Sequence, residues 1–518
     1  MPNPYTQAAL SKIPHLLSLI DKNPFSQTFG CVDRKYWRYK TRDYVNARLH
    51  ESALALAIIF SQKFEGNEYY KNDEIKKLCI AGMQYWSKIQ HSSGYFDEYY
   101  PNENSQPTTA FSALCVAKAY LLLELNDETI KNSLIKVGNY LEKSFDWQVA
   151  NHDAGACAYL YLIYKISGEK KFLELSNKRL EQLLSMQNEE GWFPEYGKAD
   201  IGYLSFTLYY LNELFELSKD KKVLESMKKA IKFYSYFIHP DYSIGGMYAS
   251  RETTFILPTA FEKTIGLIEE SAGISFALRK AIEEQKIISP IGFDDRYTAD
   301  ALYPFLQCFE LKTIGKEELK KLPAFNSADF FRNFSNTGIV INKKNNFYSI
   351  INVTKGGIGK HFFKNSLVLN DTGWVTKIDG KILTTNGASE AIVNENKIEI
   401  SGNFFAVKQE LLDTKKLIAL RTLSKLGLSG LIKQMLREKL ILNNKETNLA
   451  FKRTIDFKNK QIEINDEFSG INTAQLELSS NFSRIYTTSL GLFEEINELR
   501  QIKLSKQENR AKIYINEL

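Results

Sequence analysis

HDAGACAYLYLIY, residues 152–164, is an apolar run of helical length with almost no polar side chains after its first turn. Similar runs begin near residues 50, 108, 203, 259 and 299. Their starts are 40 to 58 residues apart, and the intervals hold amphipathic stretches such as residues 73–90. Because apolar helices alternate with amphipathic ones, the repeat predicts six helical hairpins that form an inner and an outer ring.

The sequence pattern changes near residue 334, where apolar and polar residues begin to alternate with a period of two. The β-rich segments are residues 336–344, 346–355, 397–409, 417–426 and 460–470. Turns rich in Asn, Gly and Lys separate them, which is typical of an antiparallel sandwich. We therefore expect an (α/α)6 toroid (an incomplete barrel) at residues 1–315, a linker at 316–335 and an antiparallel β-sandwich at 336–518.

Charge and cysteine content limit the partners and the compartment. The 67 basic and 61 acidic residues give a net charge of +6, which argues against nucleic acid and suits an acidic glycan. The five cysteines form no CxxC pair and predict reduced, buried thiols. No signal peptide or membrane-spanning run is visible, so we expect a cytoplasmic protein, or a periplasmic one if a leader was removed. The sequence predicts no cofactor, leaves room for a structural divalent metal in the sandwich, and does not define the oligomeric state.

Loops rich in glycine, aromatic and charged residues precede most of the apolar helices. If the hairpins are equivalent, these loops meet at one rim of the ring, where helix N-termini favour a bound anion. Asn151 and His152 stand at the start of one apolar helix, and Tyr203 at the start of the next. A phenol acts as a base only where nearby positive charge or hydrogen-bond donors lower its pKa, and Arg251 and Arg48 are both candidates for that role. Further substrate contacts are expected from Arg48, His50, Glu51, Trp37, Trp192, Tyr196, Asp200 and Glu252.

On these residues the chain resembles the heparinase II/III-like polysaccharide lyases and their alginate-lyase relatives, which join an (α/α) toroid to a following β-sandwich. In that family an Asn-His pair neutralises the uronate carboxylate, a Tyr of the next hairpin exchanges the proton, and a His of the β-region lies opposite. The resemblance implies these roles for Asn151-His152, Tyr203 and His361, with Arg251 in support. The loops at residues 191–205 and 245–255 also look like those of proteins from bacterial surface-polysaccharide clusters.

The chemistry implied by the resemblance is β-elimination on an acidic polysaccharide or oligosaccharide. Tyr203 would take the C5 proton and protonate the leaving 4-oxygen, while nearby donors stabilise the enolate-like dianion. Carboxylates are abundant in the same loops, so a glycoside hydrolase with a paired acid and base remains an alternative. A uronate C5-epimerase shares the enolate chemistry, and a non-catalytic glycan-binding protein would use only the aromatic loops. Neither the polysaccharide nor endo or exo action is defined by the sequence.

Overall fold

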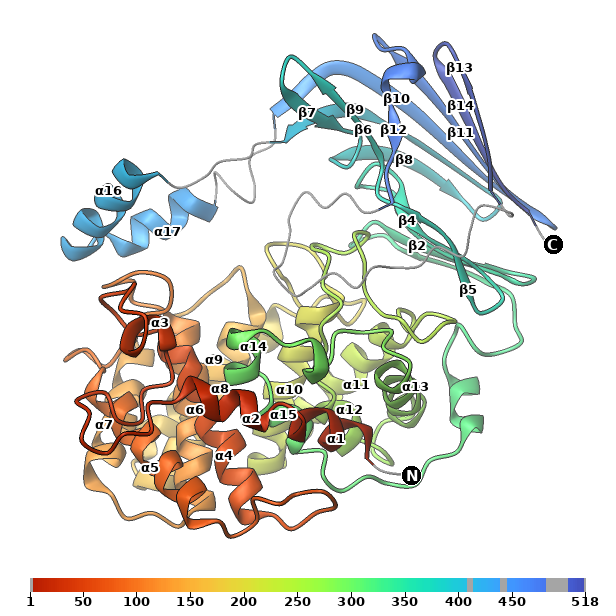
Figure 1. Ribbon diagram of the computed structural model, residues 1–518. Coiled ribbons are helices and arrows are strands. Elements are labelled where there is room, and N and C mark those ends of the chain that lie inside the picture. The colour runs from red at the N-terminus through yellow and green to blue at the C-terminus, as the bar shows by residue number, and fades with distance from the viewer. Residues whose placement is uncertain (1–2, 408–412, 438–444, 481–501, 517–518) are drawn as a thin grey trace.

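The computed structural model describes residues 3–407, 413–437, 445–480 and 502–516. It confirms the predicted architecture, a helical ring followed by antiparallel sheets that stack beside it (Figure 1). The stretches of the predicted sandwich at 408–412, 438–444, 481–501 and 517–518 lie outside the described residues. None of the helices in the described part has the length and apolar content needed to cross a lipid bilayer.

The inner ring is made of helices that are buried on most sides. Its members are α4 (Ser52–Ser61), α6 (Gln106–Leu122), α8 (Ala150–Ser167), α10 (Ile201–Ser218), α12 (Thr259–Lys263) and α15 (Tyr303–Leu306). α8 ends at Gly168, whose φ of 76° suits a left-handed C-cap. Thr259 Oγ1 donates a 2.7 Å hydrogen bond to the Pro304 carbonyl, which joins α12 to α15. Because α15 also packs on α4, the ring closes.

The outer helices bury one face only and begin at capping side chains. Asn72, Asp127 and Asp220 cap three of them by accepting backbone N–H groups of the first turn. The outer helices are α5 (Asp73–Lys88), α7 (Glu128–Leu141), α9 (Lys170–Ser185), α11 (Lys221–Ser235), α13 (Ser271–Glu283) and, from the N-terminus, α1 (Pro4–Leu10). Shorter helical pieces between them are α2 (Ile13–Leu19), α3 (Arg34–Trp37), α14 (Asp295–Asp300) and the 3-10 turns Ala47–Glu51, Pro290–Gly292 and Lys316–Lys321.

The first sheet is a five-stranded meander whose two faces are both covered. Its strands are β1 (Phe330–Phe334), β2 (Ile339–Lys344), β3 (Phe347–Asn352), β4 (Ile358–Phe363) and β5 (Ser366–Asp371). Tyr348, Ile350 and Phe362 belong to the same apolar core as the helical ring. Phe347 and Ile351 point the other way, into the core shared with the second sheet. Alternate side chains therefore bind the sheet to the toroid and to the sandwich interior.

The second sheet is larger and holds the rest of the described strands. They are β6 (Trp374–Ile378), β7 (Lys381–Thr384), β8 (Ser389–Asn394), β9 (Lys397–Val407), β10 (Lys445–Lys458), β11 (Gln461–Ser469), β12 (Glu477–Leu478), β13 (Ile502–Gln507) and β14 (Arg510–Asn516). The order is β12-β6-β7-β9-β10-β11-β14-β13, all antiparallel, and β8 also pairs with β9. A 3-10 turn, Thr473–Gln475, precedes β12.

Three details of the predicted secondary structure need correction. Residues 417–426, predicted as a strand, form most of α16 (Thr414–Lys425), which is followed by α17 (Ser429–Arg437). The cause is that Leu417, Leu420 and Leu423 recur every three residues, which suits a helix. The fifth and sixth inner helices are also shorter than their apolar runs, since α12 has 5 residues and α15 has 4. The first strand starts at Phe330, inside the predicted linker.

The five cysteines are free and buried, as the sequence predicts. Within the described residues, no group of three or more His, Cys, Asp or Glu side chains is placed to hold a metal ion.

A buried ion-pair network ties the two sheets together and should govern the stability of the sandwich. Arg453 of β10 lies 2.7 Å from Asp371 Oδ2 and 2.7 Å from Asp466 Oδ1, and Asp466 also accepts the Trp374 indole N–H. Arg453→Met leaves two buried carboxylates without their cation, so we expect a loss of about 3–5 kcal/mol in the free energy of unfolding. Urea unfolding followed by fluorescence measures this loss.

Arg510→Met is the matched control on the same sheet. Its guanidinium pairs with Glu467 at 3.1 Å, but both side chains are more than half exposed. The control should change the free energy of unfolding by less than about 1 kcal/mol. Equal losses for the two variants would contradict a dominant role of the buried network.

Candidate active site at the rim of the helical ring

The carboxylate of Asp200 organises the start of α10. Oδ1 accepts the Tyr203 N–H at 3.0 Å, which caps the helix, and Oδ2 accepts the Arg251 N–H at 2.9 Å. Burial raises the pKa of Asp200 to about 6, although the two backbone N–H groups oppose the shift. One buried side chain therefore fixes the backbone of Tyr203 and Arg251, two residues that are 48 positions apart in the sequence.

Glu195 links the start of α8 to the same loop. Its Oε2 accepts a 3.0 Å hydrogen bond from Asn151 Nδ2, and its Oε1 forms an ion pair with Arg251. The chain on either side is pinned as well, because Ala150 N–H donates to the Pro194 carbonyl and Tyr196 N–H donates to the Gln148 carbonyl. Two neighbouring hairpins thus meet at one carboxylate.

The guanidinium of Arg251 lies over the ring of Tyr203. Its Cζ is 4.1 Å from that ring centroid and 4.9 Å from the centroid of Tyr196. Burial lowers the pKa of Arg251 to about 10, so the side chain is cationic at neutral pH. Burial, with Tyr297 and Asp200 nearby, raises the pKa of Tyr203. The lowered pKa expected for Tyr203 from the sequence is therefore not found: burial outweighs the nearby cation, and the phenol is protonated at neutral pH.

His152 is oriented by an acidic partner. Its Nδ1 lies 3.0 Å from Asp146 Oδ2, and its ring meets Phe111 edge-on at 6.1 Å. Arg48 lies over the same phenyl ring, with its Cζ 5.1 Å from the centroid. The His152 side chain is 16% exposed, so it borders both the protein interior and solvent. The Phe111 ring thus connects the α8 start with a second polar network.

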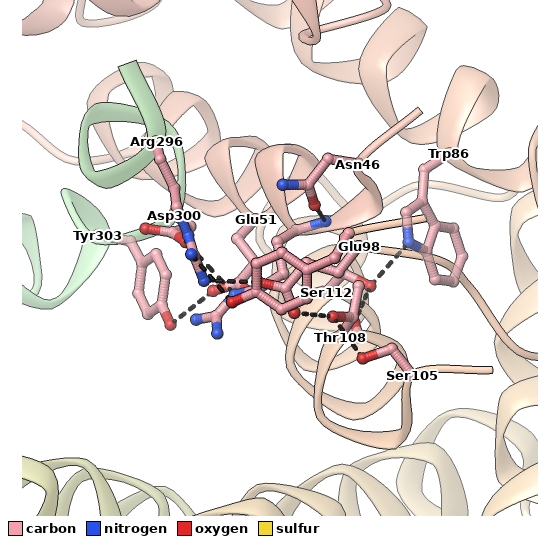
Figure 2. A network of polar contacts seen from close by, with 12 residues as sticks. Asn46, Glu51, Trp86, Glu98, Ser105, Thr108, Ser112, Arg296, Asp300 and Tyr303 are labelled. Carbon is pink, nitrogen blue, oxygen red and sulfur yellow. Dashed lines mark hydrogen bonds and ion pairs between the residues drawn. The ribbon is translucent and has the colours of Figure 1, made fainter. Parts of the chain in front are cut away.

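That second network joins the loops before α4, α6 and α15 (Figure 2). Arg48 binds Glu51 at 2.9 Å and Asp300 at 3.3 Å, while Arg296 binds Glu98 at 2.5 Å and Asp300 at 3.3 Å. Burial raises the pKa of Glu51 to about 8, although Arg48 opposes the shift. Burial also acts on Glu98, but Arg296 and Arg48 outweigh it and lower the pKa of that carboxyl. Each of these carboxyls already has a guanidinium partner.

The sandwich holds the Arg251 loop from the other side. Lys355, in the turn between β3 and β4, donates hydrogen bonds of 2.7 and 2.8 Å to the carbonyls of Met247 and Ala249. Asn352 Nδ2 donates a 2.7 Å hydrogen bond to the Tyr248 carbonyl. The loop that carries Arg251 is therefore clamped between α10 and the first sheet.

The structure brings together most of the residues singled out in the sequence. Around Arg251 lie Asn151, Tyr196, Asp200 and Tyr203. His152 is next to Asn151 in the chain, and Glu252, which follows Arg251, is partly buried. Arg48 and Glu51 belong to the adjoining network.

Other predicted residues lie away from this cluster. His50 is buried, its Nδ1 is 2.9 Å from the Gly82 carbonyl, and burial lowers its pKa to about 4. Trp192 is a core residue whose indole N–H donates to Glu190, so its side chain is not offered to solvent. The Trp37 indole N–H donates to the Leu19 carbonyl. His361 lies on β4 with its side chain buried, and its Nδ1 is 2.9 Å from Ser349 Oγ. Phe363, two residues further along the strand, belongs to the sandwich core.

Several residues of the site were missed or not distinguished in the sequence. Glu195 and Arg296 stand inside the charged loops but look like any other loop residue, because their partners come from other hairpins. Tyr99 and Trp147 are 60% and 59% exposed in the loops before α6 and α8. Their position in loops before inner helices is the signal that marks them, and Trp192, which was selected from the sequence by the same signal, is buried.

Comparison with known proteins bears on the fold. No protein-family model and no curated protein matches the sequence. Among solved structures, the chondroitin AC lyase of Streptomyces coelicolor A3 in complex with chondroitin sulphate is similar, with a TM-score of 0.53 and 8% identity. The match covers 90% of this chain and 66% of that lyase, so the chain spans about two thirds of its length.

The chain shares the fold of this chondroitin AC lyase. A second structure of the Streptomyces enzyme, a mutant, matches over 99% of this chain and 76% of its own length, at 9% identity and a TM-score of 0.53. A structure of heparinase III is also similar over 97% of this chain and 91% of its own, with 11% identity and a TM-score of 0.45. The two Streptomyces structures, whose TM-scores exceed 0.5, confirm the toroid-plus-sandwich fold that the resemblance implies.

Burial of His361 predicts acid sensitivity of the lyase-like fold. Burial lowers the pKa of His361 to about 3, below its ordinary value, so the folded state keeps the ring neutral. The stability that this contributes is complete above about pH 6.5 and is lost as pH falls toward 3. At pH 5 we expect a loss of about 2 kcal/mol relative to pH 7.5 from this residue.

His361→Asn tests the prediction, since an amide can keep the contact with Ser349 without titrating. Urea unfolding at pH 5 and pH 7.5 should show a smaller pH effect in the variant than in the wild type. Equal pH effects in both proteins would contradict the assignment.

Proposed function

We propose that this protein is a polysaccharide lyase that cleaves a uronic-acid-containing glycan by β-elimination. The observation that carries the proposal is the position of Tyr203, whose ring centroid lies 4.1 Å from Cζ of the Arg251 guanidinium. Elimination at a uronate needs a group that transfers protons. It also needs a nearby cation that stabilises the negative charge developing on the carboxylate. Tyr203 and Arg251 supply this combination, and Asp200 holds the backbone of both.

In the proposed reaction, the Tyr203 phenolate removes the proton from C5 of the uronate. The electron pair forms the C4–C5 double bond as the C4–O4 bond breaks, and the phenol returns the proton to the leaving 4-oxygen. The enolate-like dianion carries its charge on the carboxylate, where Arg251 and the Asn151-His152 pair would lie. Arg251 stays cationic at neutral pH despite its lowered pKa of about 10.

The state of the rim carboxyls favours elimination over hydrolysis. Glycoside hydrolysis needs one protonated and one ionised carboxyl that both reach the glycosidic bond. Glu98, Asp300 and Glu195 are each engaged by a guanidinium. Glu51 has the raised pKa that a general acid needs, but its side chain is fully buried. These ion pairs leave the phenol of Tyr203 as the better-placed group for proton transfer.

Exposed aromatic side chains suit a sugar chain at the same rim. Tyr99 and Trp147 are more than half exposed in the loops that precede α6 and α8. Arg296 Nη1 donates a 3.1 Å hydrogen bond to the Tyr99 hydroxyl, which fixes that ring beside the cationic network. Flat apolar faces beside guanidinium groups match a glycan that alternates sugar faces with carboxylates.

The first test is removal of the Tyr203 hydroxyl. Incubation of the wild type with a panel of uronic-acid polysaccharides should raise the ultraviolet absorbance of the unsaturated uronate. Tyr203→Phe should lower kcat by about 10²–10⁴-fold, because the proton-transfer group is lost while the ring and the Arg251 contact remain. Tyr164→Phe, at the far end of α8, is the control and should keep full activity. Reducing-sugar release without ultraviolet absorbance would instead identify a hydrolase.

The second test is the pH profile. Because the raised pKa of Tyr203 makes the phenolate the minor form, its population grows about tenfold with each pH unit below that pKa. We therefore expect kcat/KM to rise with pH from neutral into the alkaline range. A rate that peaks below pH 7 would be inconsistent with Tyr203 as the base.

A further inference from the structure

The helical hairpin α16–α17 lies on the surface and contains none of the residues proposed for the rim chemistry. Figure 1 shows it away from the strands of the second sheet, above α3 and the helical ring. It comes between β9 and β10 in the sequence. One side of the hairpin faces the toroid, and the opposite side, called the outer side below, faces solvent.

The inner side of the hairpin is fixed to the toroid. Arg421 binds Asp43 through two hydrogen bonds of 2.9 and 3.0 Å. Ser424 Oγ donates to the Pro101 carbonyl at 3.0 Å, and Ser429 Oγ donates to the Asn102 carbonyl. Tyr99 lies in the same loop, so the hairpin is docked beside the candidate active site.

The outer side of the hairpin presents large apolar side chains to solvent. Ile418 is 61% exposed, Leu426 70%, Leu431 60% and Met435 57%. An isolated exposed apolar residue is ordinary on a protein surface, but four of them on 25 residues form a patch. In a helical hairpin that is already docked on its other side, this patch points to a further contact.

The charge of the hairpin indicates what that contact is. Residues 413–437 contain six basic residues and one acidic residue, a net charge of +5, compared with +6 for the whole chain. Lys415, Lys416 and Lys425 are exposed. Basic amphipathic helices of this kind bind anionic lipid surfaces, where apolar side chains enter the headgroup boundary and the lysines meet phosphates. A second copy of the chain would instead oppose two hairpins of charge +5.

The helices have a length that suits a position on a membrane surface. α16 has 12 residues and α17 has 9. At 1.5 Å per residue they are about 18 and 14 Å long, compared with about 30 Å for the hydrocarbon core of a bilayer. We propose that the α16–α17 hairpin binds an anionic membrane surface, with Ile418, Leu426, Leu431 and Met435 inserted at the lipid interface. This contact holds the rim beside the membrane, and it does not depend on the reaction at the rim.

Vesicle co-sedimentation of the full chain tests the proposal. We expect the protein to pellet with phosphatidylcholine vesicles that contain phosphatidylglycerol, to bind pure phosphatidylcholine at least about tenfold more weakly, and to be released by salt. The variant with Ile418, Leu426, Leu431 and Met435 changed to Ser should lose at least about tenfold in binding. The variant with Lys415, Lys416 and Lys425 changed to Gln should lose the preference for anionic vesicles.

A variant with Phe25→Ser and Ile392→Ser is the matched control, since these side chains are 96% and 64% exposed elsewhere on the surface. It should bind vesicles as the wild type does. Thermal unfolding curves that coincide with the wild type show that each variant is folded. No binding of the wild type to anionic vesicles, or undiminished binding of the four-Ser variant, would overturn the proposal. A dimer in light scattering that the four-Ser variant dissociates, without vesicle binding, would overturn it in favour of a second copy.

Discussion

Two backbone N–H groups that share the Asp200 carboxylate hold the rim of this protein in place. One N–H belongs to Tyr203 at the start of α10 and the other to Arg251 on a loop between α11 and α12. Everything proposed for the site depends on that bond pair, because the guanidinium reaches the Tyr203 ring only if the loop stays on the helix start. Glu195 then extends the arrangement to α8 through Asn151. The proposed site therefore depends on three adjacent hairpins that are joined by the carboxylates of Asp200 and Glu195.

The first sheet gives this arrangement its rigid support. Strands whose residues are buried on both faces cannot slide or tilt without opening one of two apolar cores. Tyr348 packs toward the ring and donates to the carbonyl of Tyr236, which directly follows α11, while Phe347 packs into the sandwich. The sandwich is thus part of the site's scaffold, since its β3–β4 turn carries Lys355 to the Arg251 loop.

Periodicity accounts for what the sequence predicted well. Long helices buried all round, such as α8 and α10, produce apolar runs that no other element produces at that length, so the toroid and the positions of Asn151 and Tyr203 followed. The strand prediction for residues 417–426 failed because apolar and basic residues mix there without a clear period of two. Periodicity could not identify Glu195 and Arg296 as residues of the site, because their ion-pair partners come from other hairpins. Trp192 illustrates the same limit, since an indole in a loop packs inward or outward according to neighbours that are distant in sequence.

The clamp on the Arg251 loop also determines which residues of the loop can vary. Lys355 and Asn352 take hold of main-chain carbonyls at residues 247, 248 and 249, and every amino acid supplies that group. The side chains of Met247, Tyr248 and Ala249 are themselves buried, so substitution can change the surface offered to a glycan only beyond them, at partly exposed residues such as Glu252, while the anchoring bonds persist. Variation at such positions leaves the anchoring bonds in place, whereas a change at Lys355 itself removes two of them. Within this loop, the residues that anchor the backbone are therefore separate from the residues that can vary.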